Sequence, residues 1–130
     1  MHRILAADDD MLQLELRKRL FEGAGHEVVA ALTTQQTARE MKRGAIDLVV
    51  MDLRFPNAEG KSDCREGLQL IRWIREMDSR VPILVLSGAP QELEGKPEEQ
   101  MVSRVIMKPV KAAVLLAAAR ELLRAPSERL

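Results

Sequence analysis

The sequence has one cysteine, two phenylalanines, one tryptophan, no tyrosine and no excess of either charge. The single cysteine, Cys64, cannot form an internal disulfide bond. Twenty basic and twenty acidic residues give a net charge of zero, and no segment combines basic with aromatic side chains, which disfavours direct nucleic-acid binding. The longest nearly continuous apolar run, Ala112 to Ala119, is far short of the about 20 residues that cross a bilayer. The apolar run that follows the first three residues is too short for a signal peptide. We therefore expect a soluble cytoplasmic protein with no membrane contact.

A chain of 130 residues has the usual length of one domain. Its composition of 46% hydrophobic and 31% charged residues is typical of a globular protein, and we do not expect disorder. A core of this size needs neither a disulfide bond nor a structural metal. Because no repeat or linker is present, we expect a single domain over residues 1–130.

Short apolar runs alternate with stretches of helical period, which is the pattern of βα units in a parallel sheet. Five runs are candidate strands: Ile4–Ala7, Val28–Leu32, Leu48–Met51, Ile83–Leu86 and Val105–Met107. Four stretches are candidate helices: Met11–Glu22, Thr34–Lys42, Glu66–Met77 and Lys111–Leu123. This order predicts an α/β fold, with a five-stranded parallel sheet and helices on both faces.

Several local signals support the helices. In the first, leucines recur at four-residue intervals at Leu12, Leu16 and Leu20. Thr33 or Thr34 can cap the second helix, and Asp63 with Glu66 has the spacing of a capping box that opens the third. The last helix carries an apolar stripe that we expect to face the sheet, formed by Val114, Leu115, Ala118 and Leu122.

A further helix is expected between the fourth and fifth strands, and it should be short or broken. Pro90, Gly95 and Pro97 interrupt this stretch. Pro97 can serve as the first residue of a brief helix that continues to Met101.

Ligands of open α/β sheets bind beyond the carboxyl ends of the strands, so polar residues directly after each apolar run are the candidate site. These residues are Asp8-Asp9-Asp10, Asp52, Ser87-Gly88 and Lys108-Pro109. If the first strand lies beside the third, Asp8, Asp9 and Asp52 point into one crevice. Asp10 is better explained as the cap of the first helix.

Three carboxylates in one small volume cannot all stay ionised alone, so some are protonated or a divalent cation lies among them. An all-oxygen site suits Mg²⁺, or Mn²⁺, rather than zinc. A cation, a lysine and a hydroxyl around a carboxylate can stabilise a phosphoryl group during transfer. We therefore interpret Asp52 as a nucleophile for phosphoryl groups, with Ser87 and Lys108 as its catalytic partners.

At these residues the sequence resembles the receiver domain of bacterial response regulators, of the chemotaxis-regulator type. Four elements carry the resemblance in order, each after a candidate strand: Asp8-Asp9, the segment from Asp52 to Pro56, Ser87-Gly88 and Lys108-Pro109. The resemblance covers nearly the whole chain. It implies a flavodoxin-like fold with strand order 2-1-3-4-5.

The resemblance implies a phosphoprotein of two-component signal transduction, or phosphorelay. Asp52 would be phosphorylated by a histidine kinase or a histidine phosphotransfer protein. Ser87 would move toward the phosphoryl group, and Lys108 would hold it. Asp9 and Asp52 would bind Mg²⁺ directly, Asp8 would act through water, and the backbone carbonyl of Arg54 would complete the protein ligands. The chain would catalyse only its own phosphorylation and dephosphorylation, would signal to an unidentified output protein, and could dimerise.

The sequence departs from the family pattern in three places. Val105 stands where the family usually has an aromatic residue coupled to the movement of the serine or threonine, so that switch cannot operate here. The segment between Pro56 and Gly67 is longer than usual, which predicts a long loop beside the acceptor that includes Asn57, Glu59, Lys61, Asp63 and Cys64. The broken fourth helix lies on the face that family members use for output or dimer contacts.

Two alternatives remain at this stage. The chain could be a pseudo-receiver, an interaction module that is not phosphorylated; Val105 and the broken helix favour this, whereas Asp52 and Lys108 oppose it. It could also be a Mg²⁺-dependent phosphohydrolase with an aspartyl-phosphate intermediate. Such enzymes commonly place a second acid two residues after the nucleophile, where this chain has Arg54.

Four further expectations concern Arg54, Cys64, Pro109 and the extent of the protein. The side chain of Arg54 either reaches over the acceptor or lies in solvent, and Cys64 is an exposed bystander. The Lys108-Pro109 bond is a candidate for the cis form. Because no DNA-binding helix pair follows Leu123, we expect a stand-alone receiver or the N-terminal part of a longer regulator.

Overall fold

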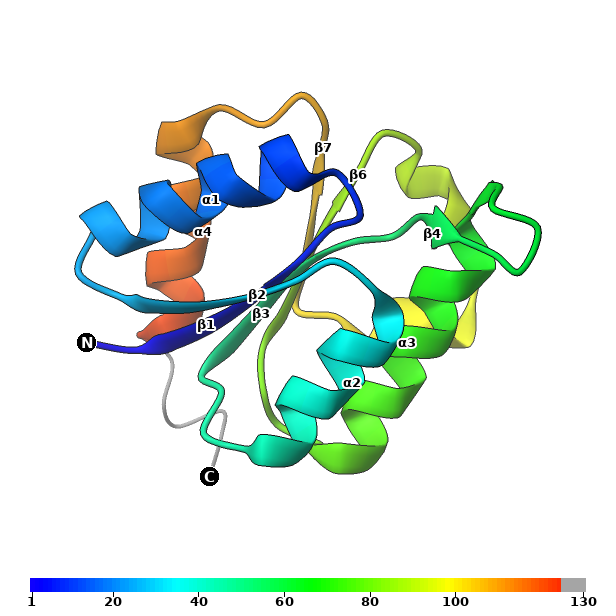
Figure 1. Ribbon diagram of the computed structural model, residues 1–130, viewed down its shortest axis with the longest axis horizontal. Coiled ribbons are helices and arrows are strands. Elements are labelled where there is room, and N and C mark those ends of the chain that lie inside the picture. The colour runs from blue at the N-terminus through cyan, green and yellow to red at the C-terminus, as the bar shows by residue number, and fades with distance from the viewer. Residues whose placement is uncertain (125–130) are drawn as a thin grey trace.

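The five apolar runs form one parallel sheet in the computed structural model, which describes residues 1–124 (Figure 1). Its strands are β1 (Arg3–Ala7), β2 (Glu27–Ala31), β3 (Leu48–Asp52), β6 (Ile83–Ser87) and β7 (Arg104–Met107). They lie in the order β2-β1-β3-β6-β7, which is 2-1-3-4-5 when only these five strands are counted. The predicted fold class is therefore confirmed.

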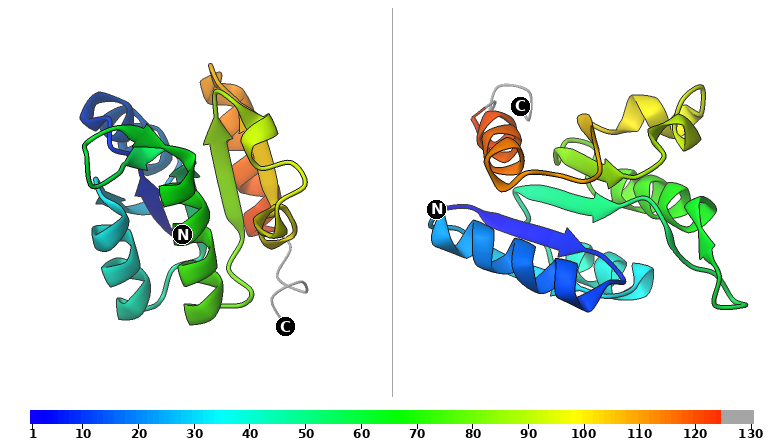
Figure 2. Two further views of the ribbon diagram at one scale, coloured as in Figure 1. Left: turned by 90° about the vertical axis from the view of Figure 1, so that its right-hand side faces the viewer. Right: turned by 90° about the horizontal axis from the view of Figure 1, so that it is seen from above.

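Helices cover both faces of this sheet (Figures 1 and 2). They are α1 (Met11–Gly23), α2 (Thr34–Arg43), α3 (Cys64–Met77) and α4 (Ala112–Leu123). Alternate strand residues point to opposite faces: Ile4 packs in the core layer with α1 and α4, whereas Leu5 packs with α2 and α3. Within residues 1–124, none of the helices has both the length and the apolar character needed to cross a membrane.

The buried edge of α1 is not the one that the leucine spacing marks. Leu12 and Leu16 are 67% and 53% exposed and Leu20 is only partly buried against the core, whereas Leu14, Arg17 and Phe21 are buried. This helix has two apolar edges, and the edge that faces the sheet is the one that buries the large ring of Phe21. A charged residue, Arg17, is buried as a result.

The predicted inward stripe of α4 is wrong at one position. Val114 is 48% exposed, while Leu115, Ala118 and Ala119 are buried and Leu122 is partly buried against the same core. Leu115, Ala118, Ala119 and Leu122 follow the three- and four-residue spacing of one helix face, and Val114 lies at the margin of that face. The small Ala119 takes part in the contact instead.

Short polar side chains set the helix starts. Asp10 caps α1 by accepting hydrogen bonds from the backbone N–H groups of Leu12 and Gln13, as predicted. Thr33, not Thr34, caps α2. Asp63 caps α3 as predicted, but the helix begins at Cys64, two residues before the expected start.

The chain between β6 and β7 contains no α-helix, which confirms the predicted break. It forms two 3₁₀ helices that each begin with proline, η1 (Pro90–Glu92) and η2 (Pro97–Met101). Leu93 between them is buried in the core, and the buried Glu98 of η2 forms an ion pair with Arg72 of α3. The burial of Leu93 and the ion pair of Glu98 therefore attach this segment to the core, where an α-helix would otherwise pack.

The segment after β3 is folded rather than a long loop. It forms an antiparallel hairpin of β4 (Phe55–Pro56) and β5 (Ser62–Asp63), with Asn57 closing the turn through its side-chain oxygen. The loop prediction was wrong at Asp63, which lies in β5, and at Cys64, which is already helical. The hairpin projects from the body of the molecule (Figures 1 and 2).

Gly67 lets α3 lie directly against the chain that follows Asp52. A Cβ atom at this position would lie 1.8 Å from the carbonyl oxygen of Leu53 and 2.5 Å from its carbonyl carbon. Both contacts are with backbone, which cannot move aside as a flexible side chain can. This close approach fixes the segment that carries the candidate acceptor.

We predict that Gly67→Ala lowers the free energy of unfolding by about 3 kcal/mol or more, because the added methyl group forces α3 away from this segment. Urea unfolding monitored by circular dichroism measures the change. Gly23→Ala at the end of α1 is the matched control, since a Cβ there meets no atom within 4 Å. Equal stability of the two variants would contradict the close packing.

Candidate functional site

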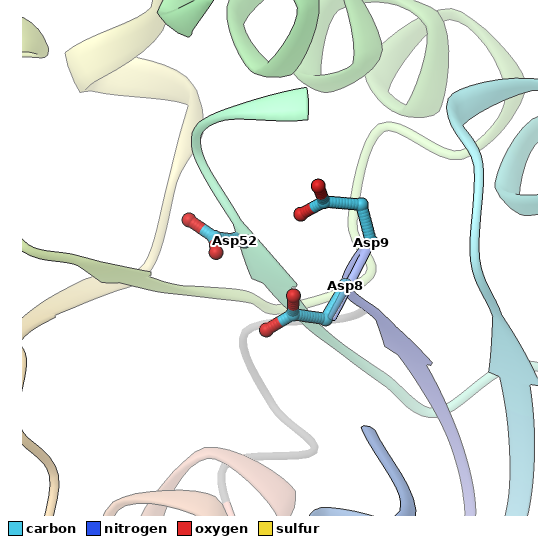
Figure 3. A group of neighbouring side chains, drawn as sticks. All are labelled: Asp8, Asp9 and Asp52. Carbon is cyan, nitrogen blue, oxygen red and sulfur yellow. The ribbon is translucent and has the colours of Figure 1, made fainter. Parts of the chain in front are cut away.

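Three carboxylates meet at the carboxyl ends of β1 and β3. The two strands pair in parallel with Ala7 opposite Met51, so Asp8 and Asp52 leave the sheet side by side. Asp8, Asp9 and Asp52 each place one carboxylate oxygen within 4.8 Å of the others, and Figure 3 shows them directed toward a common space. The crevice predicted from the sequence is present.

Both carboxylate oxygens of Asp52 accept hydrogen bonds. Oδ2 accepts one from the ammonium Nζ of Lys108 at 2.6 Å, and Oδ1 accepts one from the backbone N–H of Arg54 at 3.2 Å. Asp52 is nearly buried, whereas the side chain of Lys108 is 31% exposed. The amine and the candidate nucleophile therefore form one ion pair that remains open to a reactant.

The neighbouring strands bring Ser87 and Lys108 to the same edge. Asp52 is opposite Leu86 in β6, so Ser87 lies one residue further along that strand. Ser87 is buried; its Oγ accepts the Ala89 N–H at 3.0 Å, and its carbonyl accepts the Lys108 N–H at 2.9 Å. The Lys108-Pro109 bond is cis, which resolves the form that the sequence left open.

Asp8 is buried and bonded through both of its oxygens. Oδ1 accepts the backbone N–H of Asp10 at 2.8 Å, and Oδ2 forms an ion pair with the guanidinium of Arg17. Sequence reasoning missed Arg17 as part of this site. The available signal was its position between Leu14 and Phe21 on a helix that starts directly after the acidic run.

Asp9 differs from the other two acids because it is exposed and residues 1–124 provide no ion pair for it. Partial removal of its carboxyl group from water, together with the nearby Asp8 and Asp52 carboxylates, raises the pKa of Asp9 above its usual 3.8. Asp9 is therefore the acid whose negative charge is least compensated by the protein.

The donor set fits a hard divalent cation. It consists of three carboxylates with no cysteine or histidine among them, which suits Mg²⁺ or Mn²⁺. His2 and His26 directly precede β1 and β2, at the amino ends of the strands and thus at the opposite edge. Asp8, Asp9 and Asp52 are the described residues that can hold such an ion through side chains.

The side chain of Arg54 is exposed, as one of the two expectations had it, but it is paired rather than free. Its guanidinium binds both carboxylate oxygens of Glu92 in η1, with Nε 3.0 Å from Oε1, and donates to the Ser62 carbonyl at 3.2 Å. Cys64 beside this pair is partly buried, so the expectation of an exposed cysteine was wrong. Burial, and after it Glu92, raises the pKa of the Cys64 thiol and keeps it protonated.

Comparison with known proteins agrees with this geometry. The model of the response regulator receiver domain family matches residues 4–120. The CAI-1 autoinducer sensor kinase/phosphatase CqsS of Vibrio cholerae is 32% identical over 116 residues, which cover 88% of this chain and 16% of that protein. The chain spans only 15–16% of the length of the first curated relatives that it matches.

Solved structures show the same fold. A response regulator receiver domain protein from Clostridium thermocellum superposes with a TM-score of 0.84 at 22% identity, over 98% of both chains. The response regulator protein TrrA from Thermotoga maritima, solved in complex with Mg(2+)-BeF, gives 0.79 at 23% identity, over 94% of this chain and 99% of that one. Since the family match extends from β1 into α4 and contains every residue of the acidic crevice, the chain belongs to the response regulator receiver domain family.

Proposed function

We propose that this chain is a phosphoacceptor switch of two-component signalling and that Asp52 is the phosphorylated residue. The observation that carries the proposal is the 2.6 Å ion pair between Asp52 and Lys108 inside a pocket that also holds Asp8 and Asp9. The oxygens of a phosphoryl group need positively charged partners during transfer. Lys108 supplies one such partner directly beside the Asp52 carboxylate, and Asp8 and Asp9 can bind a cation that supplies another.

The proposed step is an in-line transfer. One carboxylate oxygen of Asp52 attacks the phosphorus of a phosphohistidine, the new O–P bond forms, and the P–N bond breaks with its electron pair returning to the imidazole. Lys108 then moves from the free carboxylate to an oxygen of the transferred group. The Ser87 hydroxyl, which lies one strand away, donates to a second oxygen.

Asp9 and Asp52 would hold Mg²⁺ directly, with Asp8 acting through water and the Arg54 carbonyl as a further ligand. When bound, the ion supplies positive charge to the phosphoryl oxygens. The carboxylate donor set of the pocket supports this assignment, as does the Mg(2+)-BeF complex of the related TrrA. Mn²⁺ is an acceptable substitute for the same all-oxygen site.

Phosphorylation would shift the population of a pre-existing active conformation. Ser87 leads directly into the chain that carries η1, and Glu92 of η1 is bound to Arg54 two residues after Asp52. We propose that this contact, rather than an aromatic side chain at position 105, carries the movement of Ser87 outward. Phosphorylation-dependent amide shifts of η1 in NMR spectra, lost in Glu92→Gln, test this route.

The proposed donor is a histidine kinase or a histidine phosphotransfer protein. The acidic group contains no histidine of its own that could carry the phosphoryl group before transfer. The sensor kinase/phosphatase among the relatives supports such a partner. We propose that residues 1–130 form a single receiver domain, of which residues 125–130 lie outside the described part. Its only reaction would be the gain and loss of its own phosphoryl group.

Incubation with acetyl phosphate and Mg²⁺ should add the mass of one phosphoryl group to the intact protein. Asp52→Asn, which keeps the shape of the side chain but removes the nucleophile, should gain none. Chelation of Mg²⁺ should slow the gain in the unchanged protein, because the transferred oxygens then lack a cation. Intact-mass spectrometry over time measures all three.

The same experiment separates the alternatives. If the unchanged protein gains no mass, the phosphoacceptor proposal fails in favour of an interaction module. If acetyl phosphate is consumed steadily while no phosphoprotein accumulates, a phosphohydrolase is favoured. The ion pair of Arg54 with Glu92, at the position where such enzymes commonly carry an acid, speaks against that outcome.

Asp9→Asn should stabilise the metal-free protein, because it removes the carboxylate whose ionisation opposes folding. A carboxyl pKa that folding raises makes the folded state favour the protonated form. The difference between variant and unchanged protein should therefore be absent below pH 3.8, where Asp9 is protonated in both states. It should open as the pH rises past 3.8 and Asp9 ionises in the unfolded chain, and it should be complete once Asp9 has also ionised in the folded protein. Urea unfolding in chelator across this range measures it, and a variant less stable at pH 7 would contradict the expectation.

A further inference from the structure

Arg17 is a buried charge in a place where the helix otherwise presents apolar side chains. It is 7% exposed, and it lies on the inner edge of α1 between Leu14 and Phe21. Burying a guanidinium is costly unless a charged partner and hydrogen bonds compensate it. Its carboxylate partner is Asp8, which is 1% exposed and is one of the three acids of the proposed metal site.

The ion pair places a permanent cation at the acidic pocket. Arg17 occupies Oδ2 of Asp8, the Asp10 N–H occupies Oδ1, and Lys108 occupies Oδ2 of Asp52. Two of the three carboxylates are therefore compensated by the chain itself. Only Asp9 keeps a negative charge without an ionic partner among residues 1–124.

We propose that Arg17 is a built-in counter-ion of this site, a positioning residue that holds Asp8 in place without metal and lowers the affinity for Mg²⁺. The inference rests on the metal-binding role proposed above. A guanidinium on Asp8 repels an incoming dication, and it engages an oxygen that would otherwise attract the hydration shell of that ion. Arg17 therefore keeps Asp8 in position when no metal is bound, and the same positive charge weakens the binding of Mg²⁺.

A purely structural role for Arg17 makes the opposite prediction for the metal. If Arg17 only fastens α1 to the sheet, its loss loosens Asp8 and leaves Mg²⁺ affinity equal or weaker. If Arg17 is a counter-ion, its loss leaves a more negative pocket and Mg²⁺ binds more tightly. The sign of the change in affinity therefore separates the two roles, whereas a loss of stability does not.

The test is calorimetric titration of Mg²⁺ into the full chain and three variants at constant ionic strength. We expect Arg17→Gln to bind Mg²⁺ about tenfold more tightly, since it removes a full charge beside a buried carboxylate. Arg17→Lys keeps the charge and should stay near the unchanged protein. Arg19→Gln is the matched control: it removes the same charge from an exposed pair with Glu15 on the same helix, and it should change the affinity less than about twofold.

Thermal unfolding over a range of Mg²⁺ concentrations provides a second measurement. Arg17→Gln should unfold at a lower temperature than the unchanged protein in chelator and gain more stability from Mg²⁺, because at one ligand concentration the tighter-binding protein is stabilised more. Equal or weaker Mg²⁺ binding by Arg17→Gln overturns the counter-ion role alone. Absence of Mg²⁺ binding in all four proteins overturns both this role and the metal site itself.

Discussion

Electrostatic repulsion among the carboxylates of Asp8, Asp9 and Asp52 is the constraint that decides which other charged residues this site requires. Parallel strands end at one edge, so the sheet brings Asp8, Asp9 and Asp52 together, with one carboxylate oxygen of each within 4.8 Å of the others. The chain offsets this with Lys108 on Asp52 and Arg17 on Asp8. Asp9, which has no ionic partner among the described residues, is then available to a cation. Lys108, whose side chain is partly exposed, is available to a phosphoryl group.

The sheet and the meeting of the acids could be predicted from the sequence because both depend on local patterns. Strands that are buried on both faces are continuous apolar runs, such as Leu48–Met51, and they stand out in a sequence with few other long runs. The residues that follow them, including Asp52 and Lys108, must then lie at one edge. Breaks in helices are also local, which is why Pro90 and Pro97 identified the altered segment between β6 and β7.

Contacts between distant parts of the chain were not predictable in this way. The helical period of α1 fits more than one inward edge, so the burial of Arg17 depends on which edge packs on the sheet. The hairpin of β4 and β5 is held by Asn57 and by its antiparallel pairing, and the bond from Arg54 to Glu92 joins residues 38 positions apart. In each case the two interacting residues can be identified only once the tertiary structure is known.

The central claim, that the fold directs phosphoryl chemistry to Asp52 alone among the three acids, can be measured at the residue itself. Borohydride reduces an aspartyl phosphate, and peptide mass spectrometry then locates the reduced side chain. After phosphorylation in Mg²⁺, the account predicts a reduced side chain at Asp52 and unmodified Asp8 and Asp9. Reduction at Asp8 or Asp9, or phosphoprotein with no reduced aspartate, would contradict it.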